Sequence, residues 1–372
     1  MNVAGVELNA AEAAPQLLGT VVAVQANYYQ VRLDSVHLLP AEPQPLEVAE
    51  LLCTRRARLK KIGQQVMVGD RVLIEEPDWA GGRGAIAQVS PRTSELSRPP
   101  ISNVDQILLV FALAEPTLDP HQLSRFLVKA ESTGLDVTLC LNKRDLLTPT
   151  EQQEWRDRLH QWGYEPILIS IYQQEGLSEL QQRLSQKITV VAGPSGVGKS
   201  SLINDLIPTL DLRVGRVSGK LGRGRHTTRH VELFELPAGG LLADTPGFNQ
   251  PEMDTAPEDL ALCFPEARQR LAAARCQFSD CLHRDEPNCA VRGDWERYED
   301  YLNLLDEAVA RQTAIARLKD AESTTKVKTT EEGQVLEPKL ESKKYRRVSR
   351  RTQQQNLKEL YKDIESGLIE PD

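Results

Sequence analysis

One glycine-rich segment carries residue types and a spacing that suit the binding of a phosphate chain. The segment Gly193-Pro-Ser-Gly-Val-Gly198-Lys199-Ser200 matches the pattern G-x-x-x-x-G-K-[ST]. Its glycines let successive backbone N–H groups point at one anion, and the amino end of a following helix adds partial positive charge. We expect Lys199 to reach the terminal phosphates of a nucleoside triphosphate and the Ser200 hydroxyl to bind Mg²⁺. The residues expected to bind the phosphates are Gly193, Pro194, Ser195, Gly196, Val197, Gly198, Lys199, Ser200 and Ser201.

A second segment, Asn142-Lys143-Arg144-Asp145, resembles the N-K-x-D motif with which the GTPase superfamily reads its base. A carboxylate at Asp145 can accept hydrogen bonds from N1–H and the 2-amino group of guanine, whereas adenine offers no such pair of donors. Lys143 would lay its stem along the base, Asn142 would brace the loops, and the backbone of Ser170 would contact the guanine oxygen. All four motif residues, Arg144 included, are assigned to GTP binding. A phosphate loop together with this motif favours GTP over ATP.

A third segment, Asp244-Thr-Pro-Gly247, resembles the D-x-x-G motif of GTPases, in which the aspartate lies near Mg²⁺. A threonine between the phosphate loop and this motif is expected to close over Mg²⁺ when GTP is bound. Thr227 and Thr228 both qualify, and their spacing does not choose between them. The expected magnesium ligands are Ser200, Thr228 and Asp244, and the expected catalytic residues are Lys199 and Thr228.

The order of these motifs along the chain is unusual. In ordinary GTPases the phosphate loop comes first, whereas here the base-reading motif begins at Asn142, before the loop at Gly193 and the D-x-x-G motif at Asp244. This order is expected if the domain were cut ahead of its base-reading half and rejoined. Circular permutation of this kind is tolerated when the original termini lie close together at the surface.

A cluster of soft ligands follows the three motifs. Cys276-x4-Cys281-x-His283-x5-Cys289 offers three thiolates and one imidazole, a full tetrahedral set for one structural Zn²⁺ with no open position for catalysis. The alternative is a group of buried free cysteines beside a surface histidine. That alternative describes better the three cysteines outside the cluster, which are Cys53, Cys140 and Cys263.

The elements that must position these residues form a multidomain α/β chain. Residues 16–97 are expected to fold as a five-stranded barrel from strands near 18–24, 28–33, 65–68, 71–75 and 84–89. An OB-type barrel is one economical solution and an SH3-like barrel is the alternative. Residues 40–51, which hold three prolines, are expected to form a loop.

From residue 98 the pattern becomes that of a parallel sheet covered by helices. Apolar runs at 106–113, 137–141, 167–171 and 188–192 alternate with helical stretches near 120–134, 150–162 and 176–186. Residues 98–250 are therefore assigned to the GTPase domain, with a hairpin at 231–236 and 240–243. Residues 251–317 are predicted to form a helical zinc-binding domain.

The two ends of the chain are expected to be less ordered. Residues 1–15 are predicted to be flexible, and the tail, 318–372, to be partly disordered, especially over 320–341. Residues 345–364 could form a basic helix that orders on a partner.

Composition restricts the class of protein. The chain has 372 residues, 40% of them hydrophobic, and no apolar run of the length needed to span a bilayer, about 18–20 residues. Its first fifteen residues contain no basic residue, so we expect neither an export signal nor a transit peptide but a cytoplasmic protein that does not associate with membranes. Six cysteines are too few for a disulfide scaffold.

Basic residues gather in three runs although the net charge is −8. The runs lie at 55–61, 212–231 and 343–351, and any one of them could be ordinary solvated surface. Three runs in an acidic chain favour a polyanionic partner. The candidates for RNA contacts are Arg55, Arg56, Arg58, Lys60, Lys61, Arg223 and Arg225.

A β-barrel, a permuted set of GTPase motifs and the Cys/His cluster, in this order, closely resemble the small-ribosomal-subunit-dependent GTPase A family over residues 16–310. The resemblance implies an OB-fold that contacts ribosomal RNA, a permuted GTPase core and a structural zinc domain. It also implies slow GTP hydrolysis, stimulated by the small ribosomal subunit, in late maturation of that subunit. We expect GTP and GDP as ligands and a monomer. The alternative function is a non-catalytic, nucleotide-dependent RNA-binding adaptor.

One departure concerns the hydrolytic water. Phe248 follows the D-x-x-G motif where Ras-type enzymes place a glutamine that orients this water, and phenylalanine cannot do so. Unassisted turnover should therefore be slow. His226 is one candidate for the missing group, and its other interpretation is a surface histidine that binds RNA phosphate. The alternative is a group supplied by the ribosome.

Overall fold

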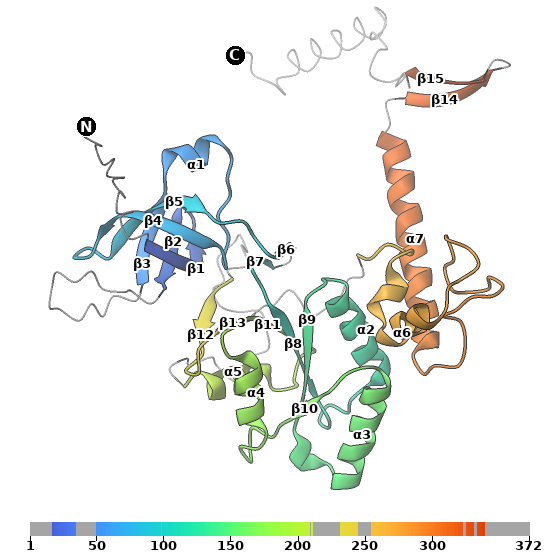
Figure 1. Ribbon diagram of the computed structural model, residues 1–372, viewed down its shortest axis with the longest axis horizontal. Coiled ribbons are helices and arrows are strands. Elements are labelled where there is room, and N and C mark those ends of the chain that lie inside the picture. The colour runs from blue at the N-terminus through green and yellow to red at the C-terminus, as the bar shows by residue number, and fades with distance from the viewer. Residues whose placement is uncertain are drawn as a thin grey trace, which may run out of the picture. The chain divides into compact units, whose positions relative to one another are not determined.

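The computed structural model describes residues 17–34, 50–97, 99–208, 210, 231–244, 254–322, 325–330 and 333–338. The chain divides into two compact units, residues 1–309 and 310–372. The first unit contains a barrel, a larger sheet flanked by helices, and a C-terminal segment with two helices and a cysteine cluster (Figure 1). In the described part of the chain, no helix has both the length and the apolar character needed to cross a membrane.

The barrel is closed by five strands in the order β1-β2-β3-β5-β4. Their bounds are Leu17–Gln25 (β1), Tyr28–Leu33 (β2), Glu50–Arg55 (β3), Arg71–Asp78 (β4) and Arg83–Val89 (β5), with a short helix α1, Ala57–Lys61, after β3. The predicted five-stranded barrel is confirmed, but one of its predicted strands is wrong. Residues 65–68 form no strand, and Val68 makes only a single bridge to Ile101.

The missed strand is β3, which overlaps the predicted loop. Leu51 and Cys53 are buried while Leu52 and Thr54 are exposed, the alternation of a half-buried strand. Tyr29 pairs with Cys53, so β3 joins β2 to the barrel. The prolines before this short alternation and the basic run after it hide the strand in the sequence.

The second sheet has six strands in the order β10-β9-β8-β11-β13-β12. Neighbours among the first five are parallel, as predicted, and β12 is antiparallel to β13. The strands are Gln106–Ala112 (β8), Asp136–Asn142 (β9), Ile167–Leu168 (β10), Ile188–Ala192 (β11), Leu233–Glu235 (β12) and Leu241–Asp244 (β13). The helices are Pro120–Glu131 (α2), Pro149–Gln161 (α3), Leu177–Leu184 (α4) and Lys199–Leu206 (α5).

The central strand β8 is buried over its whole length because helices cover both faces of the sheet. Leu109 and Phe111 pack on one face with residues of α2 and α3. Leu108 and Val110 pack on the other face with residues of α4 and α5. Figure 1 shows these two helix pairs on opposite sides of the strands.

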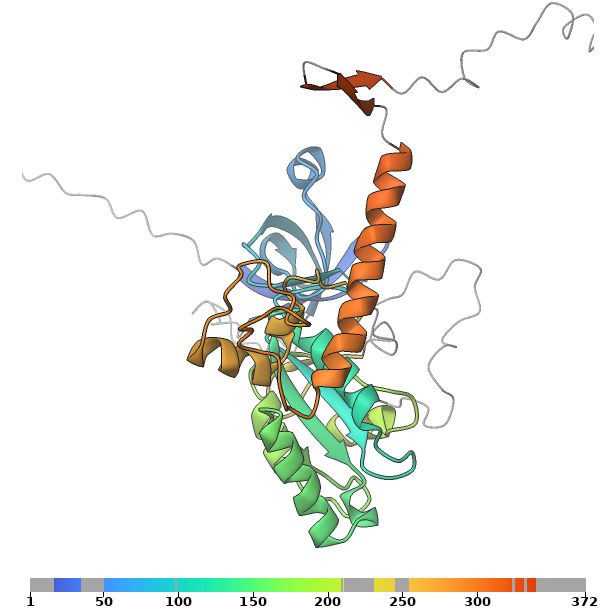
Figure 2. The ribbon, with the colours of Figure 1, turned by 90° about the vertical axis from the view of Figure 1, so that its right-hand side faces the viewer.

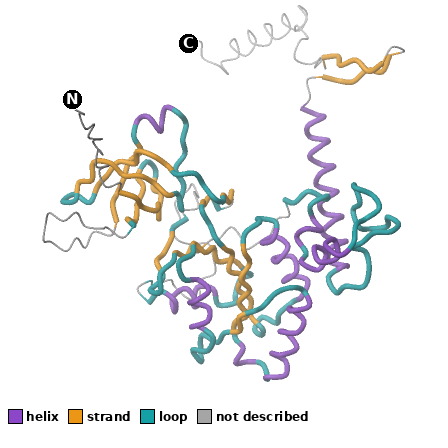
Figure 3. Tube along the Cα trace, in the orientation of Figure 1, coloured by secondary structure: helices purple, strands orange, loops and turns teal. Residues whose placement is uncertain are grey.

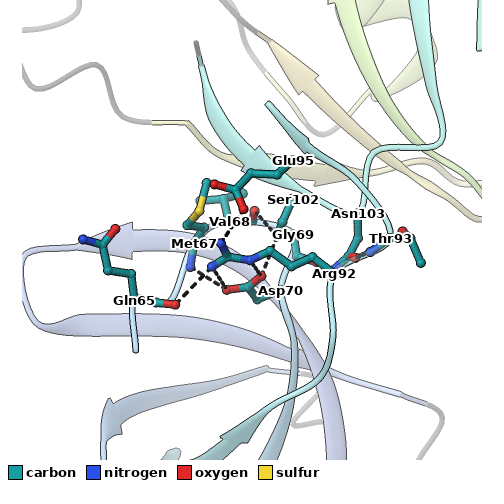
Figure 4. Close-up of polar contacts among 10 residues, drawn as sticks. All are labelled: Gln65, Met67, Val68, Gly69, Asp70, Arg92, Thr93, Glu95, Ser102 and Asn103. Carbon is teal, nitrogen blue, oxygen red and sulfur yellow. Dashed lines mark hydrogen bonds and ion pairs between the residues drawn. The ribbon is translucent and has the colours of Figure 1, made fainter. Parts of the chain in front are cut away.

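A buried carboxylate joins the barrel to the segment that leads into β8 (Figure 4). Asp70 is fully buried and accepts hydrogen bonds from Met67 N (2.8 Å), Ser102 Oγ (2.6 Å) and Arg92 Nε (2.8 Å). The segment contains two short strands, Glu95–Ser97 (β6) and Pro100–Ser102 (β7). A Cβ on Gly69, whose φ is +88°, would lie 2.0 Å from the carbonyl oxygen of Ser102, so glycine is required at this approach.

The C-terminal segment of the first unit packs on α2 and α3. It contains a 3-10 helix, Leu260–Cys263, then α6, Pro265–Ala273, and the start of α7, Tyr298–Glu322 (Figure 2). Val128 of α2 shares a hydrophobic cluster with Leu260 and Phe264. The guanidinium of Arg297 is buried, pairs with Glu266 and lies 4.8 Å from the ring of Trp162.

The tail differs from its prediction. Thr325–Thr330 (β14) and Gly333–Pro338 (β15) form an antiparallel hairpin within the residues expected to lack regular structure. Threonine and valine favour strands, and β14 contains four of them among six residues. Disorder was predicted from the low aromatic content, which takes no account of the preference of threonine and valine for strands. The predicted basic helix at 345–364 lies outside the described residues.

Candidate nucleotide site and metal cluster

The nucleotide motifs follow strands that end at one edge of the parallel sheet. Asn142 is the last residue of β9, the phosphate loop begins directly after Ala192 of β11, and Asp244 is the last residue of β13. Val191 pairs with Asp244 in the register of β11 and β13. The carboxyl edge of an open parallel sheet is where such folds bind ligands.

The phosphate loop requires glycine at positions where other backbone or side-chain atoms come close. Gly193 has φ +138°, and a Cβ there would lie 2.1 Å from the carbonyl oxygen of Val110 in the neighbouring strand β8. Gly198 has φ +98° and stands directly before α5. Lys199 Nζ donates hydrogen bonds to the carbonyl oxygens of Gly193 (2.8 Å) and Pro194 (2.6 Å), which holds the ammonium group against the loop.

The base-reading motif lies against the phosphate loop. Asn142 Nδ2 donates a hydrogen bond to the carbonyl oxygen of Val197 at 3.0 Å, and both residues are buried. A Cβ on Gly198 would lie 2.5 Å from the same Nδ2 atom. Asn142 therefore joins the two motifs, the bracing role that the sequence predicts for it.

The other motif residues occupy a tight turn. Lys143 has φ +62° and its Nζ donates to the carbonyl oxygen of Glu115, while Asp145 lies in a single 3-10 turn, Arg144–Leu146. Helix α3 follows this turn with a capping box, in which Thr148 Oγ1 accepts from Glu151 N and the Glu151 carboxylate accepts from Thr148 N. The cap fixes where the turn ends.

Ser170 lies at the same edge, but its backbone N–H and carbonyl oxygen already have hydrogen-bond partners within the protein. Its N–H donates to the carbonyl oxygen of Glu175 (3.0 Å), and its carbonyl oxygen accepts from Glu175 N–H (3.1 Å). The next amide, that of Ile171, has no acceptor among the described residues. Sequence reasoning missed Ile171, and the one signal for it is its position beside Ser170.

Several predicted residues lie outside the described part of the chain. The segment after α5 and the segment after β13 hold Arg223, Arg225, His226, Thr227, Thr228 and Phe248.

The four predicted metal ligands come together in the chain between α6 and α7, most of which is loop (Figure 3). Their ligand atoms all lie within 4.8 Å of one another. His283 Nδ1 lies 3.5 Å from Cys276 Sγ, 3.4 Å from Cys281 Sγ and 3.3 Å from Cys289 Sγ. Tetrahedral zinc with bonds of about 2.3 Å to sulfur and about 2.1 Å to nitrogen separates sulfur from nitrogen by about 3.6 Å. The donor set therefore fits a structural metal.

The surroundings of the cluster suit metal ligation. Burial raises the pKa of the Cys281 thiol to about 12, so a thiolate at this position depends on a cation. Burial also lowers the pKa of His283, which favours the neutral imidazole that binds metals. Arg292 N–H donates to Cys289 Sγ at 3.3 Å, and the Tyr298 hydroxyl donates to the carbonyl oxygen of His283 at 2.8 Å.

In the basic run at residues 55–61, some side chains bond to other protein groups and others are exposed. Arg55 donates to the carbonyl oxygen of Gln64 (2.7 Å), and Arg56 pairs with Glu75 (3.2 Å) and Glu76 (2.8 Å). The side chains of three further residues are exposed and have no ion-pair partner among the residues that the structure describes. These residues are Arg58, Lys60 and Lys61.

Known proteins resemble the whole of this arrangement. The RsgA GTPase family matches residues 89–254. The small ribosomal subunit biogenesis GTPase RsgA of Trichormus variabilis is 66% identical to this chain, with 94% of this chain and 98% of that protein covered. The protein of the same name from Microcystis aeruginosa is 57% identical, with 93% and 97% covered.

Two crystal structures share the fold. YjeQ from Thermotoga maritima is similar with a TM-score of 0.65 and 31% identity, covering 79% of this chain and 99% of that one. YloQ, described as a circularly permuted GTPase, gives a TM-score of 0.64 and 30% identity, covering 82% and 99%. The predicted barrel, permuted GTPase fold and family resemblance are thereby confirmed. The chain belongs to the RsgA family of GTPases.

Proposed function

We propose that this GTPase binds GTP across the contact between Asn142 and Val197 and acts in the biogenesis of the small ribosomal subunit. That contact carries the proposal, because it joins a base-reading motif to a phosphate loop although the two residues stand 55 positions apart. The names of the relatives, small ribosomal subunit biogenesis GTPases, support the choice of partner.

The residues divide the work of binding by chemistry. Asp145 accepts hydrogen bonds from the guanine edge, Lys143 supports the base, and the Ile171 amide donates to the guanine oxygen. The backbone of residues 193–201 holds the phosphates, and Lys199 moves its ammonium group from the loop carbonyls to the terminal phosphate. Ser200, Thr228 and Asp244 would hold Mg²⁺, which supplies charge stabilisation during phosphoryl transfer. The water-orienting group is His226 or a group of the ribosome.

The three regions have separate tasks in this proposal. Residues 16–97 contact ribosomal RNA, residues 98–250 hydrolyse GTP in the cytoplasm, and residues 251–317 hold one Zn²⁺ through Cys276, Cys281, His283 and Cys289. The separations of 3.3–3.5 Å between His283 Nδ1 and the three sulfurs support the zinc assignment. The working unit is a monomer.

The exposed basic residues of α1 are the better RNA candidates in the barrel. Arg58, Lys60 and Lys61 project from a helix that Leu59 anchors in the barrel core. Replacing these three with glutamine should weaken RNA binding and lower the slope of log affinity against log salt by about one for each phosphate that is no longer neutralised. Replacing Arg56, which already pairs with two glutamates, should change the slope less.

The decisive experiment measures phosphate release from GTP with no addition, with small subunits, with large subunits and with bulk RNA. We expect slow release that small subunits alone stimulate. Lys199→Ala should abolish release, whereas Lys187→Ala, which changes a lysine that contacts Gln106 at 3.4 Å, should not. GTP-dependent binding to small subunits without stimulated release would instead favour the non-catalytic adaptor. Stimulation by large subunits would contradict the proposed partner.

A further inference from the structure

The loop that follows β10 is closed on itself. Ser170 and Glu175 exchange both of their backbone hydrogen bonds, at 3.0 and 3.1 Å, and Gln173 N–H donates to Ser170 Oγ at 3.0 Å. Tyr172, within the loop, is 90% exposed, so this part of the loop is not held by packing. Ile171 packs against the hydrophobic cluster beneath the loop, but residues 172–175 are exposed, so polar contacts with neighbouring elements must orient that part of the loop.

Two adjacent side chains make those contacts in different directions. Gln174 Nε2 donates to Asp205 Oδ1 at 2.8 Å, on the helix α5 that begins at the phosphate loop. Glu175 Oε2 lies 3.5 Å from Arg144 Nε, in the base-reading motif. The loop is thus tied to the phosphate side and to the base side of the candidate site at once.

The backbone of the loop supports this arrangement. Gln174 has φ +59°, a left-handed conformation that costs energy for a residue other than glycine. Its Nε2 also donates to the carbonyl oxygen of Ile171 at 2.8 Å, so the same amide holds Ile171 and Asp205. A Cβ on Gly198 would lie 3.8 Å from Ile171 Cδ1, so the Ile171 side chain reaches the phosphate loop.

We propose that Gln174 and Glu175 are positioning residues for guanine recognition. They hold the Ile171 amide at the place where it donates to the guanine oxygen. This inference rests on the proposed GTP site. It adds to that site the contacts that fix the position of the Ile171 amide relative to the phosphate loop. Neither side chain touches the nucleotide in this account.

The test compares three diphosphates that differ at the base edge: GDP, inosine diphosphate and 2-aminopurine riboside diphosphate. The first two carry the oxygen that Ile171 reads, and the third lacks it. Gln174→Gly removes the amide and keeps a residue suited to positive φ, while Glu175→Gln removes the charge. We expect each variant to weaken binding of GDP and inosine diphosphate about three- to tenfold and to leave the third ligand unchanged. This is the effect of losing the exposed hydrogen bonds of Gln174 or the partly exposed ion pair of Glu175 with Arg144.

The control is Gln173→Ala, which removes an exposed amide side chain from the same loop and leaves its backbone donor to Ser170 in place. It should bind all three ligands like the unmodified protein. Asp205→Ala removes one of the two hydrogen bonds that Gln174→Gly removes, so it should weaken binding of the same two ligands, by no more than Gln174→Gly does. The double variant should lose no more than Gln174→Gly alone, because that variant already lacks the bond to Asp205.

Other outcomes separate this inference from the site on which it rests. If the variants lost affinity equally for all three ligands, the loop would have only a structural role. If they lost no affinity, the contacts of Gln174 and Glu175 would not matter for guanine binding. Either result overturns the inference while the GTP site stands. If the unmodified protein binds GDP and 2-aminopurine riboside diphosphate equally well, guanine-oxygen reading itself is wrong and the inference falls with it. Asp145→Asn, which should weaken GDP binding, tests the rest of the proposed base contact.

Discussion

Asn142 and Val197 are joined by a hydrogen bond from the side-chain amide of the first to the carbonyl oxygen of the second, at 3.0 Å. The bond links the end of β9 to the phosphate loop after β11. Strand β8 lies between these two strands in the sheet, so the contact passes over the carboxyl end of the central strand. A permuted chain can therefore assemble the base and phosphate motifs at one edge, because parallel strands carry their loops to the same edge whatever their order.

Removing the amide should damage binding and stability together. Asn142→Ala leaves the buried carbonyl of Val197 without a partner, which costs about 1–3 kcal/mol. We expect the free energy of unfolding to fall by this amount and the dissociation constant of GDP to rise about tenfold or more. Titration with a fluorescent guanine nucleotide and urea denaturation measure the two effects. Gln153→Ala, which removes an exposed amide on α3, should leave both values unchanged.

The buried carboxylate of Asp70 should contribute strongly to the free energy of unfolding. Asp70 is fully buried and accepts from Arg92, Ser102 and Met67, so Asp70→Asn leaves a guanidinium and other donors poorly matched. Breaking a buried pair on one side costs about 3–5 kcal/mol, and the partial exposure of Arg92 places the expected loss of unfolding free energy near the lower end, about 3 kcal/mol.

A matched control for Asp70 exists in the same barrel. Asp34 pairs with Arg71 through two hydrogen bonds of 3.1 and 2.6 Å, but both side chains are exposed. Asp34→Asn should cost less than about 1 kcal/mol because solvent screens surface pairs. Equal losses in urea denaturation for the two variants would show that burial of Asp70 does not matter.

Local patterns predicted most of the GTPase sheet and its motifs. The phosphate loop could be identified because its glycines, Lys199 and Ser200 have fixed spacing, and β8 because it is apolar throughout. Strand β3 could not, because its pairing with β5 depends on residues some thirty positions away. The same limit applies to Gln174 and to Arg56, whose roles depend on partners that only the fold brings near.

The zinc ligands can be tested against another buried cysteine of the same region. Cys281→Ala should lower the zinc content well below one per chain and reduce the melting temperature, because the loops around the cluster depend on the metal. Cys263→Ala changes a buried thiol outside the ligand set and should keep the metal while losing some packing. Metal analysis of both purified variants decides the assignment, and unchanged zinc in the Cys281 variant would refute it.

The contact between α2 and α7 should depend on pH. His121 Nδ1 lies 2.6 Å from Asp300 Oδ1, and this hydrogen bond, together with the charge of Asp300, raises the pKa of His121 above its usual value of about 6.5. Asp119 and Glu299 raise it further. Because the folded pKa is the higher one, the stabilisation is complete below the unfolded pKa and is lost as pH rises through the folded pKa.

The expected effect is small because His121 is mostly exposed. Hydrogen exchange at the start of α7, corrected for intrinsic rates, should show protection that declines as the pH rises above about 6.5 and through the raised pKa of His121. His121→Gln should remove this decline, since glutamine does not titrate, whereas His160→Gln should keep it because His160 pairs with Glu165 instead of α7. The second ion pair between α2 and α7, Arg125 with Glu307 at 2.7 Å, should not contribute to the decline, because arginine keeps its charge near neutral pH. A decline that persists in the His121 variant would contradict the assignment to His121.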